Sequence, residues 1–265
     1  MRRTVSAHLE STVTGPTSIV LSVAVAAGLP VATEHLSITL DGAPMQYTEL
    51  LEGDARLHLV EGIPSGQLVV DYAAEIEGQA PFAVPTQLDP IVYTRPSRYV
   101  DSDKLAPVAA ATFIGLAGKD LLDAVSSWVG QQLAYVPGSS RPTDGAVNTY
   151  LMRQGVCRDF AHLVVAMLRA LGVPARLVSV YAPGLSPMDF HAVAEALLDG
   201  QWRVVDATAL APRSTMARIA TGRDASDTSF LTTLSGILTL DAMEVGAVVD
   251  PELPADDVDQ LVSLA

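Results

Sequence analysis

Apolar and polar positions alternate in short runs over the first ninety or so residues, and this pattern predicts β-strands. Turn residues such as Asp41-Gly42 and Pro64-Ser65-Gly66 separate the runs. The expected strands cover residues 35–40, 55–60 and 66–76. The N-terminal part of the chain is therefore predicted to be β-rich.

A change in pattern marks the expected domain boundary. Four prolines lie between Pro81 and Pro96, where little periodicity remains. We expect a β-rich domain over residues 1–95 and a second domain over residues 96–265.

Beyond this boundary, apolar residues recur every three or four positions, which predicts helices. The expected helices span 119–133, a shorter segment within 143–155 with Thr143 as N-cap, and a segment from about Cys157 to the Gly172-Val173-Pro174 stop. A strand is expected at 175–182, followed by a hairpin over 190–208 that turns at Asp199-Gly200. The predicted fold class is α+β.

The net charge and the number of cysteines restrict the binding partners and the cellular compartment that we expect. The formal net charge is −14, with 16 basic and 30 acidic residues, which argues against nucleic acid and anionic membranes as partners. A single cysteine cannot form an internal disulfide, so a cytoplasmic location is expected. The apolar run 18–32 is expected to form a buried strand pair broken at residues 28–30 rather than a signal peptide, because Glu10 and other polar residues separate it from the basic start.

The lone cysteine, Cys157, lies where a helix is expected to begin. Unpaired backbone N–H groups and the positive end of the helix dipole favour an anion there. A thiolate is such an anion and is the nucleophilic form of cysteine, which a cationic neighbour stabilises further. Because a lone cysteine is most often a buried, inert residue, position alone does not establish catalysis. One cysteine and scattered histidines give no metal-ligand spacing, so neither a metal nor another cofactor is expected.

Two histidines could provide that cationic neighbour. His162 lies about 140° around the helix from Cys157, so a structural or capping role is expected for it. His191 lies on the first strand of the predicted hairpin. With a two-residue turn, partner numbers sum to 399, so His191 and Asp206 share one face as diagonal neighbours, about 7 Å apart or less.

Two other carboxylates compete with Asp206 as the partner of His191. Glu195 shares the face but lies about 13 Å along the strand. Asp189 is about 7 Å away, in a loop whose direction the sequence does not define, so it remains an alternative. A thiol, an imidazole and a carboxylate in this order form a Cys-His-Asp constellation that attacks amide carbonyls through an acyl-thioester.

The motifs around these residues resemble those of bacterial transglutaminase-like proteins, which share a papain-like thiol fold. The resemblance rests on "GVCRDFAHLVVAMLRALGVPARLVSVY" followed by "DFHAVAEALLDGQWRVVDAT". It covers residues 135–208 and continues more loosely through 220–232, and "PSRYVDSD" is similar to the usual lead-in. The sequence departs from the pattern at Val193, where tryptophan is usual, and at Ala207, where proline is usual.

The resemblance implies a helix bearing Cys157 packed on an antiparallel sheet, after a β-rich N-terminal domain. It implies Cys157 as nucleophile, His191 as base and Asp206 as orienting carboxylate, in agreement with the hairpin geometry. The sequence does not define the oxyanion donors. The backbone N–H of Cys157 is one candidate, and Tyr135 is a weaker one, with a packed aromatic residue as its alternative role. The expected activity is that of a cysteine peptidase or acyl transferase acting on a protein or peptide. The alternative is a non-catalytic scaffold or binding protein that retains the fold.

Overall fold

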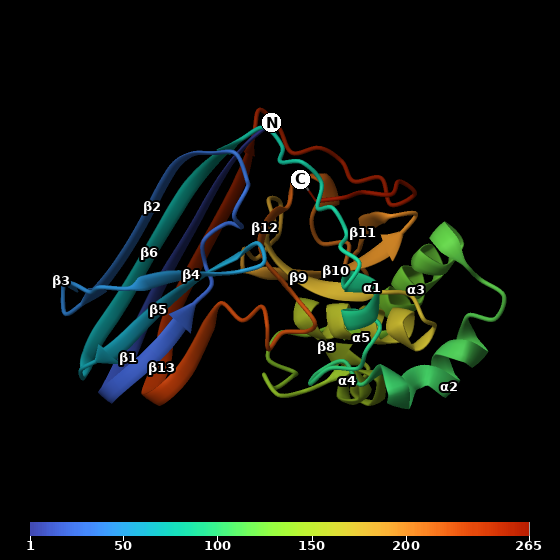
Figure 1. The fold of residues 1–265 in the computed structure, drawn as a ribbon, viewed down its shortest axis with the longest axis horizontal. Coiled ribbons are helices and arrows are strands. Elements are labelled where there is room, and N and C mark those ends of the chain that lie inside the picture. The colour runs from blue at the N-terminus through green and yellow to red at the C-terminus, as the bar shows by residue number, and fades with distance from the viewer. Residues whose placement is uncertain (265) are drawn as a thin grey trace.

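The computed structural model describes residues 1–264 and combines two antiparallel sheets with a group of helices (Figure 1). The larger sheet has the order β3-β2-β6-β1-β5-β4, and β13 pairs with β1. Its strands are β1 (Arg2–Leu21), β2 (Val31–Leu40), β3 (Ala43–Pro44), β4 (Thr48–Glu52), β5 (Ala55–Ile63), β6 (Gly66–Glu77) and β13 (Leu231–Asp250). The three expected strands are confirmed as parts of β2, β5 and β6.

The long strand β1 organises the larger sheet. Its residues 2–13 pair with β6 and residues 17–21 with β5, while β13 pairs with residues 2–14 and 18–21. Alternate side chains such as Val5, Ala7 and Leu9 are buried, because a strand directs successive side chains to opposite faces. One face of the strand therefore supplies the core of this sheet.

The strand β13 joins the two ends of the chain. It belongs to residues 96–265 by sequence, yet it hydrogen bonds with β1 at the opposite end of the chain. The division at residues 95/96 stays a prediction, and it separates β13 from the sheet in which it pairs.

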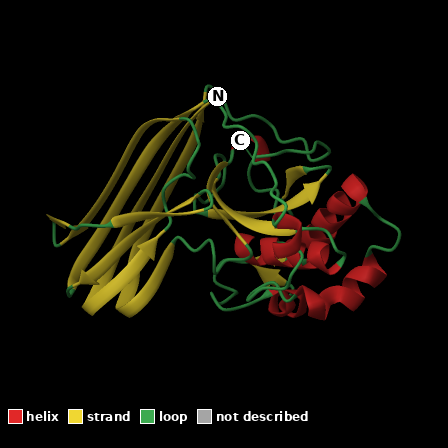
Figure 2. Cartoon of the chain, in the orientation of Figure 1, coloured by secondary structure: helices red, strands yellow, loops and turns green. Residues whose placement is uncertain are grey.

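The second unit packs helices against a smaller sheet of order β11-β10-β9-β12 (Figure 2). The helices are α1 (Asp89–Val92), α2 (Ser102–Thr112), α3 (Gly118–Gln132), α4 (Ala146–Met152) and α5 (Cys157–Ala170). The strands are β9 (Ala175–Tyr181), β10 (His191–Leu198), β11 (Gln201–Val205) and β12 (Ala217–Gly222), and β7 (Ala134–Tyr135) pairs with β8 (Gln154–Gly155). The predicted α+β class, with the cysteine helix on an antiparallel sheet, is confirmed.

The central helix α5 is buried along most of its length. Leu163, Val164, Met167 and Leu168 are fully buried among residues of α2, α3, β9 and β10. The helix ends as expected, because Gly172 has a left-handed φ of 78° that glycine adopts without steric cost. A central helix held on all sides gives its first residue a fixed position.

The expected N-cap of α4 at Thr143 is wrong, because the helix begins at Ala146 with Gly145 as the cap. The Asn148 side chain accepts a hydrogen bond from the Gly145 N–H, and the Ala146 N–H donates to the carbonyl of Tyr99. A tertiary contact therefore decides where this helix starts, and local sequence preference does not.

The two units share a hydrophobic core. Tyr181 of β9 packs with residues of the larger sheet, and its hydroxyl donates to the Val23 carbonyl at 2.7 Å. The expected strand pair over residues 18–32 is only partly correct. The strand β1 ends at Leu21, and Val23 and Val25 are buried in a connecting segment before β2.

The segment after β13 returns from the larger sheet to the helical unit (Figure 1). The Val204 N–H donates to the Val262 carbonyl at 2.8 Å, Arg213 pairs with Asp256, and Leu264 is buried. Over residues 1–264, no helix is long and apolar enough to cross a membrane.

Candidate active site

The thiol of Cys157 lies at the first residue of α5 and is half-buried. Val156 is the N-cap, and the buried carboxylate of Asp159 accepts its N–H at 2.8 Å, as in a capping box. Asp159 also accepts hydrogen bonds from Ser140 and Arg158, which attaches the preceding loop to the start of the helix. This network fixes the direction in which the helix presents Cys157.

The hairpin of β10 and β11 has the register that the sequence predicts. Its paired residues run from Leu198 with Gln201 to Ala194 with Val205, and each pair sums to 399. The turn residues Asp199 and Gly200 both have positive φ, 51° and 73°, as a two-residue type I′ turn requires. His191 therefore begins β10 as Asp206 leaves the end of β11.

The structure brings Cys157, His191 and Asp206 together. The Nε2 atom of His191 lies 3.8 Å from Oδ2 of Asp206, and their side chains are 0% and 2% exposed. The sulfur of Cys157 lies 4.0 Å from the backbone carbonyl of Phe190, the residue before His191. Since Nε2 faces the carboxylate, Nδ1 is the ring nitrogen available to the thiol.

Electrostatics favour a protonated His191. Burial lowers the pKa of this imidazole. Its contacts with Asp206 and Cys157 raise the pKa by more than burial lowers it, so the net result is a pKa of about 10. Burial also raises the pKa of Asp206, but contacts with His191 and Thr208 lower it more, so the net shift is downward. The buried carboxylate thus stabilises an imidazolium, as a base that takes a thiol proton requires.

The two competing carboxylates serve other purposes. Asp189 is exposed, and its carboxylate accepts the N–H of the next residue, Phe190, at 2.7 Å. Glu195 is fully buried between Arg176 and Arg218, each bonded to it at 2.8 Å. Neither carboxylate forms an ion pair with His191 within residues 1–264.

His162 is structural, as expected. It is fully buried, stacks on Tyr99 with ring centroids 5.7 Å apart, and its Nε2 accepts the Ala225 N–H at 3.1 Å. Accepting this bond requires a neutral ring. Burial lowers the pKa of His162 to about 4, even though Asp224 and Asp159 act in the opposite direction.

We expect His162 to make the protein less stable in mild acid. The unfolded histidine binds a proton near pH 6.5 and the folded one only near pH 4. Between these values, protonation favours the unfolded state, so His162 costs up to about 1.4 kcal/mol of unfolding free energy per pH unit as pH falls. Urea unfolding of wild type and His162→Gln at pH 4.5, 5.5 and 7 measures this slope, and parallel pH dependences in the two proteins would contradict it.

Tyr135 lies beside the thiol on β7. Its side chain interacts with Cys157, its ring packs against Phe160 at 5.8 Å, and the residue is 40% exposed. Burial and the Cys157 side chain raise the pKa of this phenol to about 12, although a hydrogen bond with the Cys157 backbone acts in the opposite direction. Tyr135 therefore keeps its proton at neutral pH and can donate a hydrogen bond beside the thiol.

The two departures from the expected motif differ in their surroundings. Val193 is 1% exposed and packs in a cluster with Val178 and Val204, so it lies in the core. A Cβ added to Gly130 of α3 would lie 2.7 Å from the carbonyl oxygen of Ala207. The second departure thus lies in a tight contact with α3.

Several residues around the site were not expected from the sequence. Thr208 and Ser126 bond the side chain and the backbone of Asp206, respectively, and Asp159 caps α5. The spacing Asp-x-Thr and the acidic third residue of the helix are local signals that could have identified Thr208 and Asp159. Ser126 had no such signal, because its contact depends on how α3 packs.

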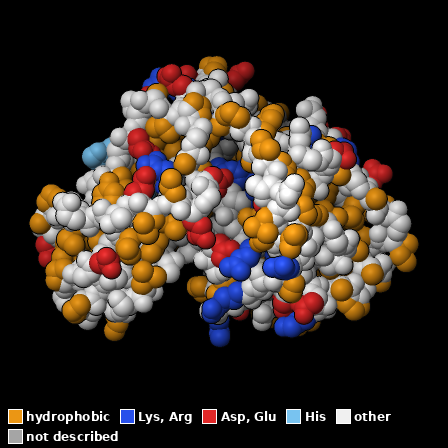
Figure 3. Space-filling view, in the orientation of Figure 1, with side chains coloured by type: hydrophobic (Ala, Val, Ile, Leu, Met, Phe, Trp, Pro, Cys, Tyr) orange, Lys and Arg blue, Asp and Glu red, His pale blue; other side chains and the backbone are white. Residues whose placement is uncertain are grey.

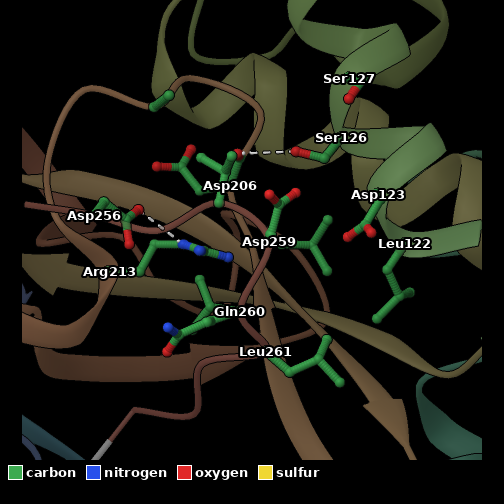
Figure 4. Close-up of a pocket in the computed structure, with 14 residues that line it drawn as sticks. Leu122, Asp123, Ser126, Ser127, Asp206, Arg213, Asp256, Asp259, Gln260 and Leu261 are labelled. Carbon is green, nitrogen blue, oxygen red and sulfur yellow. Dashed lines mark hydrogen bonds and ion pairs between the residues drawn. The ribbon is translucent and has the colours of Figure 1, made fainter. Parts of the chain in front are cut away.

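A cavity of about 110 Å³ lies behind Asp206, between α3 and the C-terminal segment (Figure 4). It is lined on the helix side by Asp123 and Ser126, and on the other by residues that include Arg213 and Asp259. In the view of Figure 3, a hollow separates the two units, and Lys and Arg side chains gather beside it.

Comparison with known proteins identifies the class of this domain. Residues 115–207 match the model of the transglutaminase-like superfamily and form a domain of that superfamily. The structure of a "putative cysteine protease" from Cytophaga hutchinsonii is similar over almost the whole chain. It is 28% identical, with a TM-score of 0.88, over 99% of this chain and 96% of that one.

Two further similarities are more limited. The uncharacterized protein ML0607 of Mycobacterium leprae is 38% identical over 58 residues, which span 22% of this chain and about a fifth (21%) of that protein. The periplasmic domain of TgpA from Pseudomonas aeruginosa is 19% identical, with a TM-score of 0.41, over 77% of this chain and 90% of that one.

Proposed function

We propose that this protein is a thiol-dependent amide hydrolase or acyl transferase that uses Cys157, His191 and Asp206 as a catalytic triad. The observation that carries the proposal is the buried His191 ring, which contacts the Asp206 carboxylate through Nε2 and interacts with the helix-start thiol of Cys157. The 28% identity to the Cytophaga hutchinsonii protein over nearly the whole chain supports a thiol enzyme with a protein or peptide substrate.

The proposed reaction starts from a thiolate–imidazolium pair, in which the proton of the Cys157 thiol has passed to Nδ1 of His191, as the raised pKa of this imidazole favours. The thiolate attacks the amide carbonyl carbon, and the carbonyl π electrons move to oxygen. Collapse of this tetrahedral species expels the amine, which takes the proton from the imidazolium, and leaves an acyl-thioester on Cys157. Water or a second amine then attacks the thioester, His191 accepts its proton, and the thiol is restored.

The developing oxyanion needs hydrogen-bond donors. The N–H of Cys157 belongs to the first turn of α5, where backbone N–H groups have no partner within the helix. The protonated Tyr135 hydroxyl supplies a second donor beside the thiol. These two groups are proposed as the oxyanion site.

A non-catalytic scaffold is the competing function. A scaffold needs neither a protonated buried histidine nor a carboxylate buried against it, and burying both without a functional need is costly. The presence of both groups beside a half-buried thiol favours the enzyme. The cytoplasmic location stays a prediction from the single cysteine.

Covalent labelling of the proposed nucleophile tests this function. We expect a peptide-derived electrophile, such as a peptide vinyl sulfone, to add one equivalent of mass, mapped by tryptic mass spectrometry to the peptide containing Cys157. The His191→Ala variant should react much more slowly at pH 7. Adducts only on other residues, or equal rates in the variant, would exclude the proposed triad. Adding a primary amine during turnover of an ester substrate then shows whether the product is the acid or the amide.

A further inference from the structure

The Asp206 carboxylate is held by a short loop that follows β11. Thr208 donates two hydrogen bonds to its Oδ1 atom, from the backbone N–H at 2.8 Å and from Oγ1 at 2.7 Å. The other oxygen, Oδ2, has no hydrogen bond among the described residues and is the atom that faces His191. The threonine thus engages one oxygen and leaves the second one for the imidazole.

The helix α3 fixes the backbone of the same loop. Ser126 donates to the Asp206 carbonyl at 3.0 Å (Figure 4). One turn later, Gly130 packs so closely that a Cβ there would lie 2.7 Å from the Ala207 carbonyl oxygen. Beyond Thr208 the chain turns sharply, because Ala209 has a φ of 50°. The loop is therefore fixed at its backbone as well as at its side chain.

Orientation matters for this carboxylate because it is buried and its contact with His191 is long. A free carboxylate rotates about its Cβ–Cγ bond, and a rotation of the Asp206 group would move Oδ2 away from Nε2. Two donors on Oδ1 oppose that rotation, since turning the group would leave them unpaired in a partly buried place.

We propose that Thr208 is a positioning residue that orients the Asp206 carboxylate toward His191. The close contact of Gly130 with Ala207 assists it by fixing the backbone of the loop. This inference rests on the proposed function, because it concerns the triad of that same site. Thr208 acts only through Asp206 and takes no part in bond making or breaking.

The test is the pH dependence of iodoacetamide alkylation at Cys157, which needs no substrate. We expect the wild-type rate to reach its midpoint below about pH 7.5, against roughly 8.5 for a free thiol. Thr208→Val removes the hydroxyl donor with little change in volume, so the midpoint should rise by about half to one pH unit. Thr208→Ser keeps the hydroxyl and should restore the wild-type midpoint.

A matched control separates this effect from general destabilisation. Thr215 is a fully buried threonine whose hydroxyl donates to the Pro212 carbonyl at 2.9 Å and not to a triad residue, and Thr215→Val should leave the midpoint unchanged. The other charged groups around Asp206 are Asp123 on α3, and Arg213 and the tail residues Asp256 and Asp259 at the cavity. None of these is altered in the test variants.

Gly130→Ala provides an independent test that does not depend on Thr208→Val folding. Alanine is a better helix former than glycine, so a purely local effect would stabilise α3. If the contact with Ala207 matters, the added methyl group will displace the loop and raise the midpoint, as Thr208→Val does.

The outcomes distinguish this inference from the proposed function. A wild-type midpoint near 8.5 that His191→Ala leaves unchanged would exclude the triad itself. A low wild-type midpoint that neither Thr208→Val nor Gly130→Ala shifts would overturn only the positioning role. A shift in Thr208→Val that Thr208→Ser fails to reverse would overturn it as well, because the hydroxyl would not be responsible.

Discussion

Replacing His191 by alanine is expected to lower amide turnover by at least about 10³-fold, as for the base of other nucleophile–base pairs. The ring is buried, with Nε2 at the Asp206 carboxylate, and it is the only imidazole that the structure places beside Cys157 within residues 1–264. Without it, nothing accepts the thiol proton or returns a proton to the leaving amine. Steady-state kcat/KM on a peptide ester or amide, measured with the melting temperature, tests this expectation.

A surface histidine provides the control for His191. His35 lies exposed on β2 of the larger sheet, and His35→Ala should keep wild-type kcat/KM. His191→Gln, which leaves a smaller cavity, covers the case in which the alanine variant is unstable. Wild-type turnover in a folded His191 variant would refute the base role.

Asp206→Asn should lower turnover by about 10 to 10³-fold and leave the fold intact. The asparagine oxygen can still accept both Thr208 bonds, so its NH₂ group would face Nε2 of His191. An NH₂ group donates, so it favours the tautomer with the proton on Nδ1, the nitrogen that must accept the thiol proton. The loss should be smaller than the roughly 10⁴-fold of the serine triad, because a thiolate–imidazolium pair forms partly without a carboxylate.

Asp189 supplies the comparison for this substitution, because it was the rival carboxylate. Asp189→Asn should reduce turnover much less than Asp206→Asn, since Asp189 bonds the Phe190 N–H and is exposed. The reverse order of effects would assign the orienting role to Asp189. A melting temperature that collapses in Asp206→Asn would mean that this carboxylate acts mainly as a structural acceptor.

Local patterns in the sequence determined the cysteine helix and the hairpin. The helix α5 follows from apolar spacing and its glycine stop, and the turn at Asp199-Gly200 sets the strand register. Because side chains alternate along strands, that register alone places His191 and Asp206 on one face. The closeness of these two residues could therefore be predicted without coordinates, and the structure has Nε2 of His191 3.8 Å from Oδ2 of Asp206.

Other features depend on contacts between distant segments, which no local pattern contains. The partner of β1 is β13, more than 200 residues later, and the start of α4 is set by Tyr99. The N-cap expected at Thr143 is wrong for that reason.

The sequence by itself determined which groups carry the proposed chemistry, because helix starts and hairpin registers are set by neighbouring residues. Only the tertiary structure decided how those groups are held. Ser126 and Gly130 of α3 contact the loop that carries Asp206, and burial shifts the pKa of His191. Both effects arise where α3 and the smaller sheet pack together. Burial and close packing are properties of the assembled chain, so they appear only once the elements meet.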